Sequence, residues 1–477
     1  MNAGSYTCPQ QLIGGRWRAP TGERRLKIVD PATAQPIGEL ALAGTADLQE
    51  ALQATDRAFA AWRQVPAHER CARLERGVAR IRAASERIAT LLTLEQGKPL
   101  AEARAECAMA ADLVKWYAEE ARRSYGRVVP ARGPGSRMQV LKQPVGPVAA
   151  FSPWNFPLVL SARKLGGALA AGCSIVLKGA EETPASVAAM VACLAEELPE
   201  GVLQLVYGDP AQVSQVLVAS PVIRKVSFTG SVPVGRQLAQ LAGQHLKRIT
   251  LELGGHAPVI VCEDADVSRA VNLLATHKFR NAGQACLAPT RFFVAHRIHD
   301  AFLEAFTAAA RGLQLGAGTA AGTQMGPLAS ARRQQAVQDL IARSVARGAR
   351  ALTGPAPEQG FFVAPTVLAD VPLEAAAMVE EPFGPVACVL PFDSLEQAIT
   401  LANRSAYGLA GYLFTDSARA IQAVSDRLEV GSLAVNGIGV SVPEAPFGGV
   451  KDSGYGSESG CEGMEAFLDS KFMHYTA

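Results

Sequence analysis

The sequence predicts an α/β protein whose parallel sheets are covered by helices on both faces, a doubly wound fold. From Val145 onward, short apolar strand-like segments alternate with helical segments, and this alternation is typical of parallel sheets. The chain has 477 residues, too many for one ordinary core, so two or three domains are expected. A hydrophobic content of 49% with 19% charged residues indicates a well-buried globular protein.

Composition and charge argue against several classes of function. The 46 basic and 44 acidic residues are scattered, so the basic patch of a nucleic-acid-binding protein is missing and no nucleic-acid partner is expected. The N-terminus lacks the pattern of a secretory signal, and the longest uncharged apolar tract, Leu165–Leu177, is too short to cross a bilayer, so no membrane association is expected. Nine dispersed cysteines without a CxxC pair indicate free thiols in a reducing cytoplasm. His296 and His299 have ligand-like spacing but no nearby partner, so we expect a solvated loop there and no metal site.

The first part of the chain, to about Tyr125, is expected to start irregularly and continue as helices. Helices are predicted at residues 47–62, 66–92 and 100–117, where apolar residues recur at helical spacing. Asp47 is the candidate N-cap of the first of them. Residues 127–142 are punctuated by glycine and proline and then become strand-like, which indicates an excursion from the domain rather than part of its core.

Two series of alternating strands and helices follow. The first series has strands predicted at 148–151, 174–178, 203–206 and 225–229, and helices at 161–171, 185–196 and 211–220. The second series has strands at 259–261, 291–295, 386–390 and 411–414, and helices at 265–278, 300–312, 394–403 and 418–427. The Gly/Pro-rich stretch Gly437–Gly456 is too long for a simple turn and indicates a functional loop. The tail, Met464–Tyr475, is strand-like and amphipathic and would suit pairing with another subunit.

Three turns carry side chains that could act together in catalysis. Cys286 lies on a Gly-Gln-Ala turn, where its sulfur is sterically open. Glu252 ends an apolar run before a Gly-Gly bend, and Asn155 lies in the turn SPWNFP. A thiol, a carboxylate and a carboxamide could serve as nucleophile, general base and oxyanion donor if the turns converge. Taken singly, each residue is more commonly a packing cysteine, a strand-end carboxylate or a turn asparagine.

Two further turns are candidate dinucleotide sites. The segment FTGSVPVG, residues 228–235, joins a strand to a helix start through Gly230 and Ser231, where a pyrophosphate can dock. Lys178 and Glu181 follow another strand, and the Glu181 carboxylate could accept both hydroxyls of an adenosine ribose while repelling a 2′-phosphate. NAD is therefore favoured over NADP as the cofactor. Taken singly, either turn could be an ordinary connection with exposed polar residues.

Seven ordered segments make the chain resemble the NAD(P)-dependent aldehyde dehydrogenase family over essentially its full length. They are residues 153–157 (PWNFP), 178–181 (KGAE), 228–231 (FTGS), 252–255 (ELGG), 283–286 (GQAC), 381–385 (EPFGP) and 446–449 (PFGG). The resemblance implies a Rossmann-like dinucleotide-binding domain (1–126 and 143–252), an α/β catalytic domain (253–459) and a small β-element for oligomerisation (127–142 and 460–477). It also implies a homodimer or homotetramer.

The same resemblance implies a role for each site residue. Cys286 would be the nucleophile, Glu252 the general base and Asn155 an oxyanion donor. The dinucleotide would be held by Trp154, Lys178, Glu181, Gly230, Ser231, Gly254, Glu381 and Phe383. A binding-only relative would lack Cys286 or Glu252, and a thiol esterase would lack the dinucleotide turns, so both alternatives are disfavoured. A carboxylate base also argues against a coenzyme-A-acylating relative, whose thioester must survive water.

Within the family, the chain is most similar to succinate-semialdehyde dehydrogenases and related semialdehyde enzymes. By that similarity, Arg163, Arg280 and Ser441 would bind the carboxylate at the far end of the substrate. The alternative is that both arginines make structural salt bridges. Succinate semialdehyde is the predicted substrate. 2-Oxoglutarate semialdehyde, glutarate semialdehyde and a short hydroxyaldehyde stay open, because one methylene changes binding by only about 1–3 kcal/mol.

Overall fold

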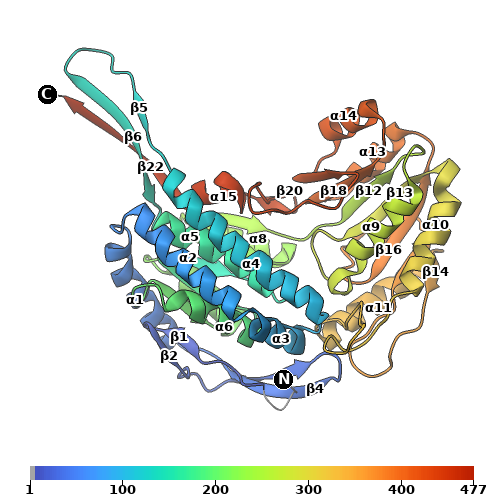
Figure 1. Cartoon of the computed structure of the whole chain (residues 1–477), viewed down its shortest axis with the longest axis horizontal. Coiled ribbons are helices and arrows are strands. Elements are labelled where there is room, and N and C mark those ends of the chain that lie inside the picture. Colours follow the sequence, from blue (N-terminus) through green and yellow to red (C-terminus); the bar gives the residue numbers. More distant parts are fainter. Residues whose placement is uncertain (1–5, 477) are drawn as a thin grey trace.

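The computed structural model describes residues 6–476, which form two large sheets with helices packed on them and a projecting arm (Figure 1). In spatial order, the first sheet consists of β2 (Arg16–Arg18), β1 (Gln11–Ile13), β9 (Leu203–Val206), β8 (Ile175–Lys178), β7 (Val148–Phe151), β10 (Lys225–Thr229), β11 (Arg248–Glu252) and β21 (Gly454–Tyr455). The run from β9 to β11 is parallel, and the remaining strands pair antiparallel at the edges.

The second sheet is also mainly parallel. In spatial order, it consists of β14 (Arg350–Thr353), β15 (Thr366–Ala369), β16 (Val386–Phe392), β13 (Pro289–Ala295), β12 (Ala257–Val261), β18 (Ala410–Phe414) and β19 (Ser432–Val435). Only β14 pairs antiparallel with its neighbour. The short strands β17 (Tyr407–Gly408) and β20 (Val450–Lys451) pair separately. These sheets confirm the predicted α/β class.

Helices cover both sheets. Those of the first half are α1 (Thr45–Trp62), α2 (Ala67–Ala83), α3 (Ser85–Gln96), α4 (Leu100–Glu120), η2 (Ala121–Arg123), α5 (Pro157–Ala171), α6 (Pro184–Ala195), α7 (Pro210–Ala219) and α8 (Val232–Gln244). Those of the second half are α9 (Val267–Phe279), η3 (Arg280–Gly283), α10 (His296–Arg311), α11 (Ala331–Val345), α12 (Ala376–Val379), α13 (Leu395–Asn403), α14 (Ala418–Arg427) and α15 (Gly460–Glu465). Within residues 6–476, no helix combines the length and apolar character needed to cross a membrane.

Helix α5 is the most completely enclosed of the long helices. Every one of its residues except Val159 is buried, including Arg163 and Lys164. An apolar helix with no solvent-facing side belongs in a core, and α5 packs against α4 there. Charged side chains in such a helix need partners of their own. Lys164 has one in Glu458, whereas Arg163 makes no salt bridge within residues 6–476.

The predicted strands and helices of the two βα series are all present, with ends that differ by up to four residues. Helix α5 begins at Pro157 rather than at residue 161, because proline suits the first turn of a helix. The solvated loop expected at His296 and His299 is wrong, since α10 begins at His296 and holds both in its first turn. Strands β14 and β15 and helix α11 were not predicted.

Two predictions for the N-terminal helices are also wrong. Gly44 is the N-cap of α1, and Asp47 lies one turn inside, where its carboxylate accepts the Gly44 amide at 2.9 Å. The helix expected over residues 66–92 is interrupted at Ala84, which separates α2 from α3. Apolar spacing stays in phase across this break, so the pattern alone did not reveal it.

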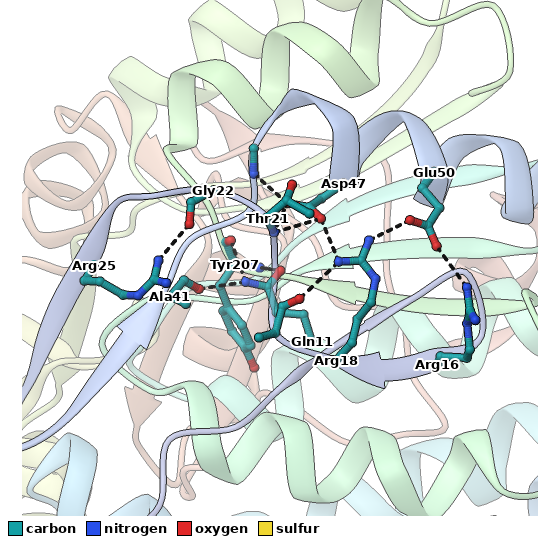
Figure 2. A network of polar contacts seen from close by, with 12 residues as sticks. Gln11, Arg16, Arg18, Thr21, Gly22, Arg25, Ala41, Asp47, Glu50 and Tyr207 are labelled. Atoms are coloured by element: carbon teal, nitrogen blue, oxygen red, sulfur yellow. Dashed lines mark hydrogen bonds and ion pairs between the residues drawn. The ribbon is translucent and has the colours of Figure 1, made fainter.

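The irregular start expected for the chain is wrong, because it forms β1, β2, β3 (Arg25–Asp30) and β4 (Gln35–Ala41). Figure 2 shows polar contacts that hold this N-terminal segment against α1 and the first sheet. Arg18 pairs with Asp47 at 2.8 Å and with Glu50 at 2.6 Å, both on α1. The Gln11 amide donates to the carbonyl oxygens of Ala41 at 2.8 Å and Tyr207 at 3.1 Å. These partners lie far along the chain, so local sequence gives little sign of the strands.

The arm is a sheet of β22 (Leu468–Thr476), β6 (Ser136–Pro144) and β5 (Arg127–Val129), and it projects away from the body with the C-terminus near its tip (Figure 1). Strand β22 pairs antiparallel with β6 along its whole length. Val128, Phe472 and Tyr475 on this arm are 78%, 56% and 58% exposed. The predicted excursion and the strand-like tail are confirmed.

Candidate active site

Asn155 and Cys286 line one cavity of about 140 Å³ together with Arg163, Arg280 and Ser441, the three residues expected to bind the substrate. Arg163 comes from α5, Arg280 begins the η3 turn after α9, and Ser441 lies in the loop after β19. The other walls are mainly apolar. Segments that are far apart in the sequence therefore meet around Cys286.

The turn that carries Cys286 has an unusual backbone. Asn281 and Ala282 both have a φ of 52°, in the left-handed region that non-glycine residues rarely adopt. Such residues cluster at functional sites, where surrounding contacts hold them. Gly255 passes close by, since a Cβ there would lie 2.2 Å from the carbonyl oxygen of Cys286. The Gly-Gly bend after Glu252 is therefore required for this approach.

The Asn155 side chain is buried, and its Nδ2 donates to the carbonyl oxygen of Gln284 at 3.0 Å. The Asn155 carbonyl oxygen accepts from the Lys98 ammonium and from the Asn281 amide, both at 2.8 Å. Lys98 is itself fully enclosed and pairs with Glu106 at 2.5 Å. A buried cation thus anchors the backbone of the turn that presents the Asn155 amide.

Glu252 ends β11, and neither of its carboxylate oxygens has a hydrogen-bond partner within the described residues. Burial, and then the nearby Glu458 carboxylate, raise the pKa of Glu252 well above its ordinary value. Glu458 is held by the Lys164 ammonium of α5 at 2.5 Å, and Lys164 also donates to Thr229 at 2.7 Å. Glu252 is therefore a buried carboxyl group with a raised pKa and with no hydrogen-bond partner among residues 6–476.

The Cys286 side chain is partly exposed toward the cavity. Its low-polarity surroundings, followed by the Glu381 and Glu252 carboxylates, raise the pKa of the thiol to about 12. Arg163 acts in the opposite direction. Cys286 is consequently a protonated thiol in this conformation and needs a base or a change in its surroundings to ionise.

We call the part of the cavity wall formed by Arg163, Arg280 and Ser441 its far end; the two guanidinium groups there make no salt bridge within residues 6–476. Arg163 is 2% exposed, and its Nη2 donates to the Ser441 hydroxyl at 2.6 Å. Its Nε and Nη1 have no partner within the described residues. The guanidinium of Arg163 stacks 3.8 Å from the Phe447 ring centroid, and that of Arg280 lies 5.1 Å from Phe156. Among residues 6–476, neither arginine makes the carboxylate salt bridge that the structural alternative requires.

The residues expected to hold the dinucleotide lie at strand ends of the first sheet and beside the Gly-Gly bend. Lys178, which ends β8, pairs with Glu181 at 2.6 Å. Ser231 is the N-cap of the 13-residue helix α8, and its side chain makes no capping hydrogen bond.

Beside the bend, the Glu381 carboxylate accepts the Gly255 amide at 2.9 Å, and a Cβ at Gly254 would lie 2.4 Å from Glu381. The rings of Trp154 and Phe383 meet edge to face at 5.6 Å. The predicted residues thus fall into two groups, one at the strand ends of the first sheet and one at the bend.

The sequence pattern of the aldehyde dehydrogenase family matches residues 17–473. The chain belongs to the aldehyde dehydrogenase family. It is 76% identical, over 99% of both chains, to a 4-(hydroxymethyl)benzenesulfonate dehydrogenase of Comamonas testosteroni. It is 41% identical to the glutarate-semialdehyde dehydrogenase of Pseudomonas putida, over 97% of both chains. The crystal structure of a succinate-semialdehyde dehydrogenase from Burkholderia pseudomallei superposes with a TM-score of 0.96 at 41% identity, covering 98% of both chains.

Members of this family use NAD or NADP, and the residues present in this aldehyde dehydrogenase fit such a group. Without a side-chain cap at Ser231, the first amides of α8 are available to a pyrophosphate. Glu181 and Lys178 offer a carboxylate and an ammonium at the carboxyl end of β8, where doubly wound sheets bind ribose.

Sequence analysis missed the buried polar groups behind this aldehyde dehydrogenase site: Lys98, Glu106, Lys164 and Glu458. Lys164 gave a signal, because it and Arg163 are the only charges in the apolar segment that became α5. Lys98 gave none, since its partner Asn155 lies 57 residues away in sequence. His277 was missed as well, although it lines the same cavity three residues before Arg280.

Proposed function

We propose that this aldehyde dehydrogenase oxidises, with NAD, an aldehyde that carries an anionic group at its far end. The observation that carries the proposal is the buried Arg163 guanidinium: Arg163 lines the cavity of Cys286, and its Nε and Nη1 have no hydrogen-bond partner among residues 6–476. Leaving a buried charge unpaired is strongly destabilising. A carboxylate or sulfonate would offset this cost through charge-assisted hydrogen bonds to the guanidinium fork.

Cys286 begins the proposed reaction. Its thiol must lose a proton before the sulfur attacks the aldehyde carbon, because its pKa is raised to about 12. The carbonyl oxygen then becomes an oxyanion, and the Asn155 amide and the Cys286 backbone N–H donate to it. The Asn155 amide nitrogen donates one of its two hydrogens to the Gln284 carbonyl oxygen, which leaves the other hydrogen for the oxyanion.

Bound NAD would supply the hydride acceptor that oxidises the tetrahedral carbon to a thioester. Glu252 then removes a proton from water, and the resulting hydroxide attacks the thioester and releases the acid from Cys286. The raised pKa of Glu252 makes it a stronger base than an ordinary carboxylate, and its two unpartnered oxygens leave it free to bind that water. NAD is preferred to NADP in this proposal because the Glu181 carboxylate would repel a 2′-phosphate.

Within this class, an aromatic aldehyde with a sulfonate is the best candidate substrate. The relative at 76% identity is named for a benzenesulfonate that carries a hydroxymethyl group. An alcohol carbon is not electrophilic, so Cys286 would act on the aldehyde at that position, 4-formylbenzenesulfonate. The apolar walls around Cys286 suit an aromatic ring. Succinate semialdehyde stays a prediction, supported by the relatives at about 40% identity and by the same arginines.

The arm is proposed to pair with another subunit in a homodimer or homotetramer. Its exposed Val128, Phe472 and Tyr475 are apolar or aromatic side chains on a sheet with free edges, which favours association. The division into a dinucleotide-binding domain, a catalytic domain and this oligomerisation element is likewise proposed, because each large sheet has its own hydrophobic core.

A substrate panel tests the proposed function. The purified enzyme is assayed by NADH formation with 4-formylbenzenesulfonate, succinate semialdehyde, glutarate semialdehyde, benzaldehyde and butanal. We expect kcat/KM to be at least about tenfold higher for anionic aldehydes than for neutral aldehydes of the same skeleton, since hydrogen bonds to charged groups contribute about 1.5–3 kcal/mol. Equal or better use of benzaldehyde and butanal would overturn the proposal.

A further inference from the structure

His277 adds a polar ring to the wall of the catalytic cavity. It lies on the last turn of α9, three residues before Arg280, and both residues line the cavity of Cys286. Arg280 directly follows α9 and leaves the helical geometry with a ψ of 134°, but its side chain and the His277 ring both line this cavity. The mechanism proposed above does not use His277.

The hydrogen bonds of the His277 ring fix its tautomer. The Tyr412 hydroxyl donates to the carbonyl oxygen of Leu287 at 2.7 Å, and Leu287 directly follows the nucleophile. A carbonyl oxygen only accepts, so Tyr412 uses its single hydrogen there. The Tyr412 oxygen, 2.8 Å from His277 Nε2, must then accept from the ring. His277 therefore carries its proton on Nε2, and Nδ1 makes no hydrogen bond to any residue from 6 to 476.

The ring can become a donor at Nδ1 without taking up a net proton. Burial, then Arg280 and Lys278, lower the pKa of His277 to about 4, so a neutral ring is favoured near pH 7. If the Tyr412 hydroxyl turns its hydrogen from Leu287 to Nε2, the imidazole proton can move to Nδ1. The exchange gives up one neutral hydrogen bond, and a hydrogen bond to an anion is stronger.

We propose that His277, with its Nδ1–H, is a third partner of the distal anion beside Arg163 and Arg280, and that it selects a three-oxygen sulfonate over a two-oxygen carboxylate. This inference rests on the proposed function, which brings an anionic aldehyde into the cavity. Arg163 and Ser441 reach the cavity from α5 and the loop after β19, whereas Arg280 and His277 reach it from the end of α9.

The geometry of the two anions explains the selection. A carboxylate directs two oxygens within one plane, which a guanidinium fork matches. A sulfonate directs three oxygens as a tripod, and the third oxygen points out of the plane of any one fork. A donor at another point of the cavity wall, the His277 ring, would meet that third oxygen, whereas a carboxylate leaves the donor unused.

Three aldehydes that differ only at the para position test the inference: 4-formylbenzenesulfonate, 4-formylbenzoate and benzaldehyde. In His277→Gln, the amide can still reach Tyr412 but places no donor at the Nδ1 position. His277→Asn places an amide N–H near the Nδ1 position and gives up Tyr412. Thr276→Ala changes the exposed neighbour of His277 on the same helix and is the control.

For His277→Gln, we expect kcat/KM for the sulfonate to fall about tenfold or more, through KM, while the value for the benzoate falls less than about threefold. His277→Asn should recover part of the sulfonate preference, and Thr276→Ala should match the wild type. Equal losses on both anions, or an unchanged sulfonate preference in His277→Gln, would overturn the role of His277. A wild-type enzyme that prefers benzaldehyde to both anions would instead contradict the proposed function.

Discussion

The two ends of the catalytic cavity present opposite electrostatic problems. At the reaction end, burial and then the neighbouring Glu458 carboxylate raise the pKa of Glu252. At the far end, Arg163 is buried, its Nε and Nη1 have no hydrogen-bond partner, and no carboxylate lies within salt-bridge distance in the described part of the chain. The ionised form of Glu252 is therefore disfavoured at the reaction end, whereas the Arg163 cation at the far end has no carboxylate partner. Under the proposed function, the near end would serve every aldehyde, whereas the far end would select among them.

The strongest test of the near end is Cys286→Ala. We expect oxidation of all aldehydes to fall by roughly four orders of magnitude or more, because loss of a nucleophile removes the covalent pathway. Dinucleotide binding, followed by protein fluorescence, should persist. Cys461→Ala is the matched control, since Cys461 is exposed and does not line the cavity. A Cys286→Ala enzyme that kept most of the wild-type rate would place the chemistry elsewhere.

Glu252→Gln should separate the two chemical steps. A single burst of NADH is expected to survive, while steady-state turnover falls by about 100-fold or more because the thioester lacks its base. Burial and Glu458 raise the pKa of Glu252, so it is protonated at pH values where an ordinary carboxyl is ionised. The wild-type steady-state rate should therefore rise with pH as Glu252 ionises, and Glu252→Gln should lose that rise. Full turnover in the variant would show that another base acts.

Glu181 belongs to neither end of the catalytic cavity. Glu181→Ser therefore tests whether the choice between NAD and NADP is independent of the choice of aldehyde. We expect wild-type kcat/KM to be higher with NAD than with NADP, and the ratio to narrow by about tenfold in the variant, because like-charge repulsion of the 2′-phosphate is removed. The ratio between anionic and neutral aldehydes should stay constant. Equal use of both cofactors by the wild type would contradict the assignment of Glu181.

Ser441→Ala should have the smallest effect on kcat/KM among the variants of the far end. The variant removes one neutral group that accepts from Arg163 at 2.6 Å, so we expect kcat/KM for anionic aldehydes to fall only about three- to tenfold. Benzaldehyde oxidation should change less. A loss as large as that of an arginine variant would mean that Ser441 positions Arg163 rather than contacting substrate.

Elements with local signals were predicted well from the sequence. Strands β9 and β10 and helix α14 occur at the expected residues, because the patterns of short apolar strands and amphipathic helices can be recognised within a few residues. Strands β1 to β4 were missed because their stability comes from partners such as Tyr207 and Asp47, far along the chain. The predicted cavity residues Asn155, Cys286, Arg163, Arg280 and Ser441 do converge.

What the sequence could not supply is the environment of each site residue. The anchoring of Asn155 by Lys98, the raised pKa of Glu252 and the unpaired N–H groups of Arg163 all depend on side chains brought together by folding. His277 illustrates the same limit, because its tautomer depends on Tyr412, 135 residues away. A residue type can suggest a role, but burial and partners determine whether that role is possible.

The most direct test of the account compares Arg163→Met with the wild type on 4-formylbenzenesulfonate and benzaldehyde. Methionine keeps much of the length and apolar packing of arginine beside Phe447 but removes the charge. We expect kcat/KM for the sulfonate to fall by roughly two orders of magnitude, since removing one partner of a desolvated charge pair costs about 2–5 kcal/mol. The value for benzaldehyde should fall less than about threefold. Equal losses on both aldehydes would show that Arg163 is structural and would contradict the central claim that the far end binds an anion.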